Sequence, residues 1–429
     1  MQKLRVTGTV RSNRLSSMWL ALAVCSCLCS PVAAAEAQID SLGDVRKELQ
    51  SAWRQHPSAL AAAATLAAVR ARSRAAGQPM YNPEVELEAD HEGADELRTI
   101  GLSQSLDLSG KGQARRELGD AELALGEAQY ALKRAEFVRD WLIGRARLAS
   151  SGRQVGIGAE RVLLARRMAG LAERQFAAGD ISGPERDLVL LARDEAIAEQ
   201  ASLLADAAAV RETFARAGGN VPLSSPPALP GEPPPVPRAL AELDVTDLPE
   251  LVVARAEEAA AEQRVRVTTR DRHPDPTLTV RGGTIDSEAG KGTVIGVSIS
   301  MPLFVRNNYR AETEAARFDA DSANALVRSQ RQDLLARAAS AFTTYAAMRD
   351  AWVSWQSSRG TDLATRSNAL ERLWTAGELS TSDYVLQGKQ TLDTALAGAA
   401  LEGRMWQSYF EYLYAMGQLD HWARLEDQA

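Results

Sequence analysis

The sequence predicts a mainly α-helical protein with two β-hairpins, built as a duplicated unit of helix, β-hairpin, long helix and returning helix. Two stretches support this prediction: residues 100–115, IGLSQSLDLSGKGQAR, and residues 295–310, IGVSISMPLFVRNNYR. Each alternates apolar and polar residues for about eight positions, as a half-buried strand does, and then changes to a helical period. The same event about 195 residues apart indicates an internal duplication.

The N-terminus has the features of a secretory signal. An apolar run at 18–28 follows a basic region and precedes the small residues Ala33, Ala34 and Ala35, so we expect cleavage before Glu36. An uncleaved membrane-anchoring helix is an alternative, but the run is short and is followed by Pro31. The chain's cysteines all lie in this segment, and lipidation of one of them is a further alternative: Cys25, Cys27 and Cys29. A chain cleaved after Ala35 has no disulfide, thiolate metal site or cysteine nucleophile.

Charge and hydropathy limit the partners of the mature chain. Without residues 1–35 the chain has 45 basic and 56 acidic residues, and its formal charge changes from −7 to −11. This balance argues against a nucleic-acid partner and is compatible with an acidic channel that concentrates cations or with ordinary solvated faces. Beyond the signal no run of eighteen apolar residues occurs, so we expect any membrane crossing to use β-strands.

The two hairpins are expected at about 83–90 with 97–108, and at about 276–281 with 293–303, the second pair joined by a Gly-rich loop at 282–292. Four strands cannot close a barrel, so a membrane-spanning form requires oligomerisation, with eight strands from two copies or twelve from three. Glu84, Glu86 and Glu88 share the face opposite Val85 and Leu87, and in a barrel they would face the lumen. A soluble hairpin with one wet face is the alternative.

Long helices are expected to surround these hairpins. Apolar and Ala positions recur at alternating spacings of four and three after residue 111 and again after residue 310, which is a coiled-coil pattern. A helix over 111–178 would be on the order of 100 Å long, too long for one amphipathic helix on a globular core. Gly152, Gly156 and Gly158 are candidate points of bending or interruption. Shorter helices are expected at 42–75 and at 248–270.

Both long helices are predicted to end in similar tight turns, ERQFAAGDISGPE (173–185) and ERLWTAGELSTSD (371–383). Gly179 and Gly377 stand where a left-handed residue ends a helix. Capping boxes are predicted for Ser182 with Glu185 and for Ser380 with Asp383, so helices at 184–218 and 383–418 should run back antiparallel. The Pro-rich segment 221–237 is predicted to be extended, as a flexible linker or as a strap lying on the helices.

The order and double occurrence of these motifs resemble the TolC-like outer-membrane efflux factors of Gram-negative bacteria, over nearly the whole mature chain. The resemblance is closest to the heavy-metal, CzcC-like branch. The motifs that carry it are Gln55-His56-Pro57 (where the family usually has Asn-Pro), Asn82-Pro83-Glu84, the stretch 101–111, and Ser300 to Phe304 followed by Arg306-Asn307-Asn308.

The resemblance implies a homotrimer in the outer membrane, with a 12-stranded barrel in lipid that is continued by an α-helical coiled-coil barrel in the periplasm. The residue patterns divide the chain into a signal peptide (1–35), a first repeat (36–220), a Pro-rich linker (221–245), a second repeat (246–420) and a tail (421–429). The implied function is passive conduction of substrate, heavy-metal cations in this branch, from the periplasm to the exterior. The implied partners are a periplasmic adaptor (membrane fusion) protein and an inner-membrane RND pump, and no cofactor is implied.

The resemblance places the two tight turns at the periplasmic tip, where they would dock the adaptor or gate the channel. The candidate residues are Gly179, Asp180, Ser182, Glu185, Asp187, Gly377, Glu378, Ser380 and Asp383. We hypothesise that the acidic members gate the closed end or favour cations, although Glu185 and Asp383 are also explained as helix caps. Tyr81, Phe304 and Tyr309 flank the strands, either as a membrane-interface belt or as junction packing.

Other classes of protein fit the sequence less well. The mature chain has no HExxH, GxSxG, Walker or paired-cysteine motif, so an enzyme is not expected. The histidines are isolated in sequence, and we expect no metal site. A periplasmic adaptor would have one coiled-coil hairpin and a Gly-rich lipoyl-like domain, whereas two hairpins and no such domain are predicted here. A drug-efflux or type I secretion channel is the alternative that keeps the fold and changes the cargo.

Overall fold

The computed structural model describes residues 45–93, 95–219, 233–236, 245–287, 290–358 and 363–423. The predicted signal at 1–35, most of the Pro-rich linker and residues 424–429 lie outside these ranges. Met1–Val45 and Arg46–Ala429 form separate units, and the second contains the hairpins and the helices discussed below.

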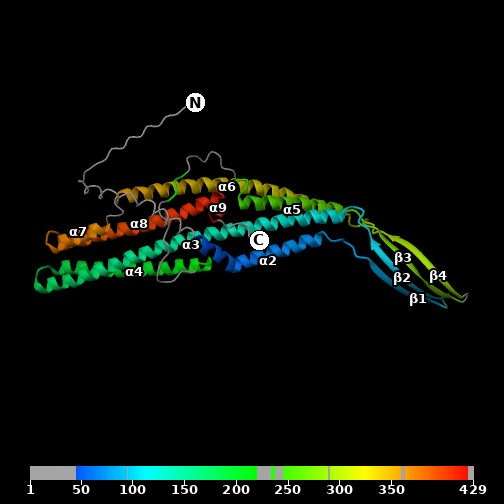
Figure 1. Ribbon diagram of the computed structural model, residues 1–429, viewed down its shortest axis with the longest axis horizontal. Coiled ribbons are helices and arrows are strands. Elements are labelled where there is room, and N and C mark those ends of the chain that lie inside the picture. The colour runs from blue at the N-terminus through cyan, green and yellow to red at the C-terminus, as the bar shows by residue number, and fades with distance from the viewer. Residues whose placement is uncertain are drawn as a thin grey trace, which may run out of the picture. The chain divides into compact units, whose positions relative to one another are not determined.

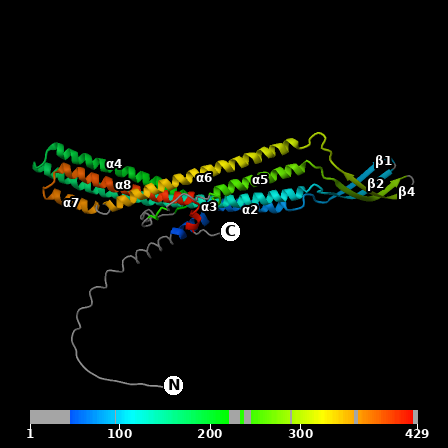
Figure 2. The ribbon, with the colours of Figure 1, turned by 90° about the horizontal axis from the view of Figure 1, so that it is seen from above.

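Within Arg46–Ala429 a helix, a hairpin, a long helix and a returning helix are followed by a second helix and hairpin, then by two successive helices in place of one long helix, and by another returning helix. The sheet lies at one end of this unit, and the turns α3–α4 and α7–α8 lie at the other (Figures 1 and 2). After helical residues 46–55 the elements are α2 (Pro57–Ala76), β1 (Glu84–Glu92), β2 (Asp95–Ser105), α3 (Lys111–Ala178), α4 (Gly183–Arg216), α5 (Pro249–Asp271), β3 (Thr277–Ser287), β4 (Gly290–Ser300), α6 (Arg310–Ser358), α7 (Leu363–Thr375), α8 (Thr381–Ala415) and α9 (Leu419–Ala423).

The first helical segment differs from the prediction, because the expected helix at 42–75 is broken at His56. His56 has an extended backbone (φ −72°, ψ 133°), and its side chain accepts a hydrogen bond from the amide of Ser58. Pro57 has no amide hydrogen to donate to a preceding turn, so it starts α2 and does not continue the helix before it.

The four strands form one antiparallel sheet in the order β1-β2-β3-β4. The second hairpin is longer than predicted, because much of the expected loop at 282–292 belongs to β3 and β4. Gly283 pairs with Thr99, and a Cβ at this position would lie 2.0 Å from the carbonyl oxygen of Arg98. This glycine therefore permits close approach of two strands and does not mark a turn.

Helix α3 is continuous over the predicted range 111–178, and it contacts α2, α4, α5 and α8. The glycines considered as interruptions lie inside the helix; a Cβ at Gly156 would meet no atom within 4 Å. Small residues permit close helix contacts elsewhere: the Cβ of a residue at Gly403 of α8 would lie 2.4 Å from the Ser150 side chain of α3. These contacts fit the Ala-rich helical seam predicted from the sequence.

An aromatic cluster packs α6 against the C-terminal part of α8. Tyr345 is fully buried and stacks on Tyr412, with ring centroids 5.5 Å apart. Its hydroxyl donates to the carbonyl oxygen of Pro234 at 2.5 Å, and Arg349 Nε donates to the same oxygen at 3.0 Å. The short described part of the Pro-rich linker, 233–236, therefore lies on α6, as the strap interpretation predicted.

Candidate functional site

The sheet has one face of exposed apolar side chains. Val85 of β1 pairs with Leu102 of β2, which pairs with Val280 of β3, and Val280 pairs with Val297 of β4. All four are between 49% and 67% exposed, and other apolar residues on this face are similarly exposed: Leu87, Ile100, Ile295 and Ile299. A folded chain rarely leaves so much apolar surface in water, so this face marks a contact with lipid or with another protein.

The three predicted carboxylates lie on the opposite face of the sheet. Glu84, Glu86 and Glu88 pair with Ser103, Gly101 and Thr99 of β2. Glu88 is held by two groups, because its Oε2 accepts from Thr99 Oγ1 at 3.1 Å and lies 3.2 Å from Arg281 Nη1.

Glu84 and Glu86 are exposed and have no ion pair among the described residues. The sheet thus separates an apolar face from a face where two carboxylates are open to solvent.

A buried ion pair joins the first and second parts of the chain where the strands meet the helices. Lys111 Nζ lies 2.8 Å from Asp275 Oδ2, and the Lys111 and Asp275 side chains are 9% and 5% exposed. The Tyr81 hydroxyl donates to the same oxygen at 2.7 Å. Tyr81 therefore packs into this junction, as the packing alternative predicted. The buried Asp275 carboxylate is satisfied both by the charge of Lys111 and by the hydrogen bond from Tyr81.

Both tight turns have the predicted geometry at the end of a helix. Gly179 and Gly377 have φ values of 84° and 75°. The amide of Asp180 donates to the carbonyl of Gln175 at 2.9 Å, and the amide of Glu378 donates to that of Leu373 at 2.9 Å. These bonds satisfy the last carbonyl groups of the helices, as expected for a Schellman ending.

The caps that follow the two turns are related but unequal. Ser182 and Glu185 form a full capping box, and the hydrogen bonds from Ser182 lower the pKa of the Glu185 carboxyl. Ser380 accepts from the amide of Asp383 at 3.1 Å, while its hydroxyl donates to the Asp383 carboxylate. Only Glu185 completes its predicted capping box, because among the described residues the Asp383 carboxylate accepts from the Ser380 hydroxyl and not from the Ser380 amide. Neither arrangement tests a further role in gating.

The remaining acidic candidates at the tip have different surroundings. Asp187 lies 2.6 Å from Arg186 Nη2, so its charge is partly neutralised. Asp180 and Glu378 are exposed and form no ion pair among the described residues. Each turn thus has one exposed carboxylate that forms no ion pair with the described residues, and this residue directly follows the left-handed glycine of the turn.

Next to the tip, an apolar cluster packs α3 and α4 against α7 and α8. Met168, Ala172 and Val189 are buried against Leu370 and Tyr384. Trp374 stacks on Tyr384 with ring centroids 4.8 Å apart and planes inclined by 9°. The two turns are therefore held together by packing and do not project as independent loops.

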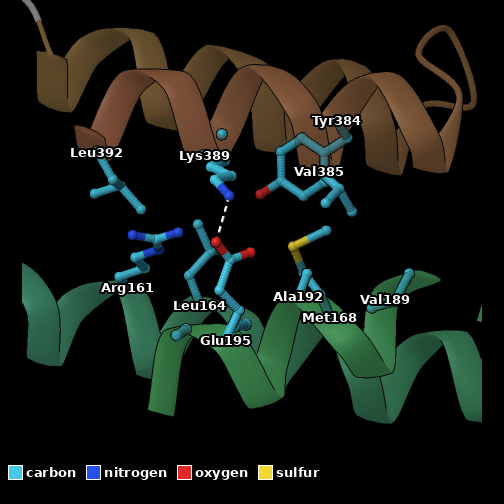
Figure 3. A pocket seen from close by; sticks show the side chains of 13 residues that line it. Arg161, Leu164, Met168, Val189, Ala192, Glu195, Tyr384, Val385, Lys389 and Leu392 are labelled. Atoms are coloured by element: carbon cyan, nitrogen blue, oxygen red, sulfur yellow. Dashed lines mark hydrogen bonds and ion pairs between the residues drawn. The ribbon is translucent and has the colours of Figure 1, made fainter. Parts of the chain in front are cut away.

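Beside this cluster a cavity of about 40 Å³ is bordered by ion pairs between the two parts of the chain (Figure 3). Lys389 of α8 donates to Glu195 of α4, and Arg161 of α3 pairs with Glu199 of α4 and with Asp393 of α8. The hydrogen bond from Lys389, with the charge of Lys389, lowers the pKa of Glu195 despite some burial.

Sequence reasoning missed these cross-helix pairs, because their partners lie up to 232 residues apart. The sequence shows where each charged residue lies along its helix, but not which residue of another helix it faces.

No group of three or more His, Cys, Asp or Glu side chains is placed to hold a metal ion in the described ranges. None of the helices in those ranges combines the length and the apolar character that a membrane span requires.

Comparisons with known proteins show which proteins this chain is similar to. A family model described as Outer membrane efflux protein matches residues 247–415. The Campylobacter jejuni CmeC outer membrane channel has a TM-score of 0.74 at 13% identity, covering 88% of this chain and 86% of that chain. The outer membrane protein VceC of Vibrio cholerae has a TM-score of 0.69 at 18% identity, covering 88% and 96%. The CusC channel has a TM-score of 0.71 at 14% identity, covering 88% and 92%. The fold is that of outer-membrane efflux channels.

Among curated proteins, the cobalt-zinc-cadmium resistance protein CzcC of Cupriavidus metallidurans is 28% identical over 246 residues. The match covers 53% of this chain and 55% of that protein, so it spans about half the length of the curated relative. Residues 247–415 therefore match the outer membrane efflux protein family model, and the chain is similar to CzcC, in agreement with the resemblance of its motifs. The matched family model and the solved neighbours are of outer-membrane proteins and channels, in agreement with the expected outer-membrane location and with the expectation of a channel component in place of an enzyme.

Proposed function

We propose that three copies of this chain form the outer-membrane channel of a tripartite, RND-type efflux system. The observation that carries the proposal is the sheet, whose apolar face is exposed and whose edge strands β1 and β4 have no further partner among the described residues. In lipid these edges must be paired, because unsatisfied backbone groups there cost several kcal/mol each, so the strands of several copies close into one barrel.

The number of copies follows from the space that a conduit needs. About eight strands give a barrel interior just wide enough to be filled by its own side chains, whereas a larger barrel encloses a channel. Two copies of a four-stranded sheet give the first case, and three give the second. The trimer also suits the predicted repeats, 36–220 and 246–420, which would each supply one hairpin and one coiled-coil pair to the tube.

The cargo we propose is a heavy-metal cation. With the apolar face toward lipid, the opposite face of the sheet lines the lumen, where Glu84 and Glu86 present free carboxylates. Negative charges in a confined passage raise the local concentration of cations. The printed name of the CzcC relative, which refers to cobalt, zinc and cadmium resistance, supports the same cargo.

We place the two tight turns at the periplasmic end of the channel, where they dock the adaptor protein that connects it to the pump. The turns lie at the end of the helices farthest from the sheet (Figure 1). Asp180 and Glu378 supply exposed charge there, and the apolar cluster in which Val189 packs with Leu370 and Tyr384 holds the two turns in a fixed arrangement. Transport through the tube is passive, and the pump supplies the energy.

Two experiments test this function. The purified full-length chain should run as an oligomer that dissociates on heating, and it should open ion-conducting channels in planar bilayers. A monomer without conductance would reject the proposal. Deletion of the gene, followed by growth tests with cobalt, zinc, cadmium, copper and a panel of drugs, identifies the cargo. Sensitivity to drugs alone would reject the metal assignment and leave the channel assignment intact.

A further inference from the structure

One junction connects β2 to α3 and a second connects β4 to α6, and each has a basic residue. The surroundings of the two basic residues differ. In the first junction Lys111 is buried against Asp275. Arg306 stands 195 residues further on, at the corresponding place in the second junction, and it is exposed. The position that corresponds to Asp275, directly before the proline that precedes β1, is Asn82, which has no charge to offer. The second junction therefore lacks the internal acid that satisfies the first.

The apolar face of β4 continues past the end of the strand into this second junction. Met301, Leu303 and Val305 keep the alternation of the strand and are 52%, 72% and 84% exposed. The apolar surface then ends at Arg306, and Arg310 follows at the start of α6, also exposed. Neither arginine forms an ion pair with an acidic side chain among the described residues.

The segment that carries these groups is held in a fixed shape by its own side chains. The Asn307 and Asn308 carboxamide oxygens accept from the amides of Tyr309 and Arg310 at 3.0 and 3.2 Å. The Phe304 ring contacts the Tyr309 ring edge-on, with centroids 5.0 Å apart. Tyr309 has a left-handed backbone (φ 55°), which is unusual for a bulky residue and shows that the turn is strongly determined by its surroundings.

We propose that residues 303–310 form a lipid-headgroup site, which binds an anionic phospholipid of the membrane leaflet on the helical side of the sheet. This inference rests on the proposed function, because it needs the apolar strand face to lie in lipid. Leu303 and Val305 then reach the acyl-chain boundary, and the guanidinium groups of Arg306 and Arg310 meet the phosphate. Guanidinium forms bidentate hydrogen bonds with phosphate and is weakly hydrated, so it suits this boundary.

The test measures lipid preference directly. The full-length protein is purified in a neutral detergent and titrated with phosphatidylglycerol or with phosphatidylcholine of the same acyl chains, and native mass spectrometry measures the bound fraction of each. We expect wild type to prefer phosphatidylglycerol, and each of Arg306→Gln and Arg310→Gln to reduce this preference about fivefold. Arg174→Gln with Arg331→Gln removes two exposed charges elsewhere on the helices and should retain the wild-type preference.

Channel conductance in phosphatidylcholine bilayers separates failure of this inference from failure of the proposed function. Equal binding of the two lipids by a wild-type protein that conducts would overturn the headgroup site alone. The headgroup site would also be overturned if the preference survived in the double variant Arg306→Gln/Arg310→Gln, or if it were lost in the control. A wild-type protein that neither inserts nor conducts would overturn both.

Discussion

The contact between α8 and α3 predicts opposite effects for two glycine-to-alanine substitutions on the same helix. A Cβ at Gly403 would lie 2.4 Å from Ser150 Cβ and Oγ, whereas a Cβ at Gly388 would meet no atom within 4 Å. Ser150 has little freedom to move away, because it is 5% exposed and its hydroxyl donates to the carbonyl of Ala399 at 2.9 Å. Gly403→Ala should therefore destabilise the protein, and Gly388→Ala should stabilise it.

The size of each change in the free energy of unfolding follows from two opposing effects. Replacing a glycine inside a helix by alanine stabilises by about 1 kcal/mol, through the lower backbone entropy of the unfolded chain. Forcing an extra methyl group into a packed contact costs about 1–3 kcal/mol. Gly388→Ala should raise the free energy of unfolding by about 1 kcal/mol. Gly403→Ala should lower it by up to about 2 kcal/mol, so the two variants differ by the whole overpacking cost.

The assay is denaturant unfolding of the full chain in detergent, followed by tryptophan fluorescence, with Ser150→Gly as the second arm of a double-mutant cycle. Removing the Ser150 side chain makes room for the new methyl group, so Gly403→Ala should become favourable by about 1 kcal/mol in that background. An equal effect of Gly403→Ala in both backgrounds would refute the reasoning, since the loss would then not come from the Ser150 contact.

Three further predictions concern the tip, the ion pairs and the strands. Ser182→Ala removes the side-chain cap of α4 and should lower the free energy of unfolding by about 1 kcal/mol, and an unchanged value would mean that the cap is not formed in solution. Lys389→Met should lower it by less than about 1 kcal/mol at pH 7, because both partners are half exposed. Since Lys389 lowers the pKa of folded Glu195, this stabilisation is present above the unfolded pKa of about 4.3 and is lost as the pH falls below it; a difference that grows in acid contradicts the assignment. Glu84→Gln with Glu86→Gln should reduce the cation selectivity of single channels, and unchanged selectivity would reject the lumen orientation of these side chains.

Local sequence signals predicted most of the fold. The spacing of glycine and serine in the two turns indicated the ends of α3 and α7 and the starts of α4 and α8, because a left-handed residue and a side-chain cap each depend on a few neighbouring positions. The same reasoning failed at 282–292, where glycine was interpreted as a loop signal. Gly283 is instead needed for the close approach of β3 to β2, which only the assembled sheet shows.

The residues that form the two turns at the tip could be predicted from the sequence, but the ion pairs that connect the helices near the tip could not. Gly179, Asp180, Gly377 and Glu378 were identified from the repeated motif, and they lie in the two turns as expected. The buried Arg161, which connects α3 to both α4 and α8, gave no local signal, because one arginine among many on a long helix does not show which face is covered. Long-range pairing of this kind depends on helix rotation and register, which heptad spacing fixes only loosely.

The buried junction at Lys111 also bears on how the proposed trimer would assemble. Strands β2 and β3 come from the two different hairpins, yet they pair along ten positions within one chain, from Glu96 with Asp286 to Ser105 with Thr277. The ion pair of Lys111 with Asp275 closes the base of this pairing, so in the proposed trimer each copy would contribute a complete four-stranded sheet. The pairing that remains for a barrel is β4 of one copy with β1 of the next. The junction after β4 has Arg306 in place of the buried lysine, and no acid of the described residues pairs with Arg306. In the proposed trimer the interface between copies would therefore close without a fixed internal ion pair, and the charge of Arg306 would stay available to the membrane surface.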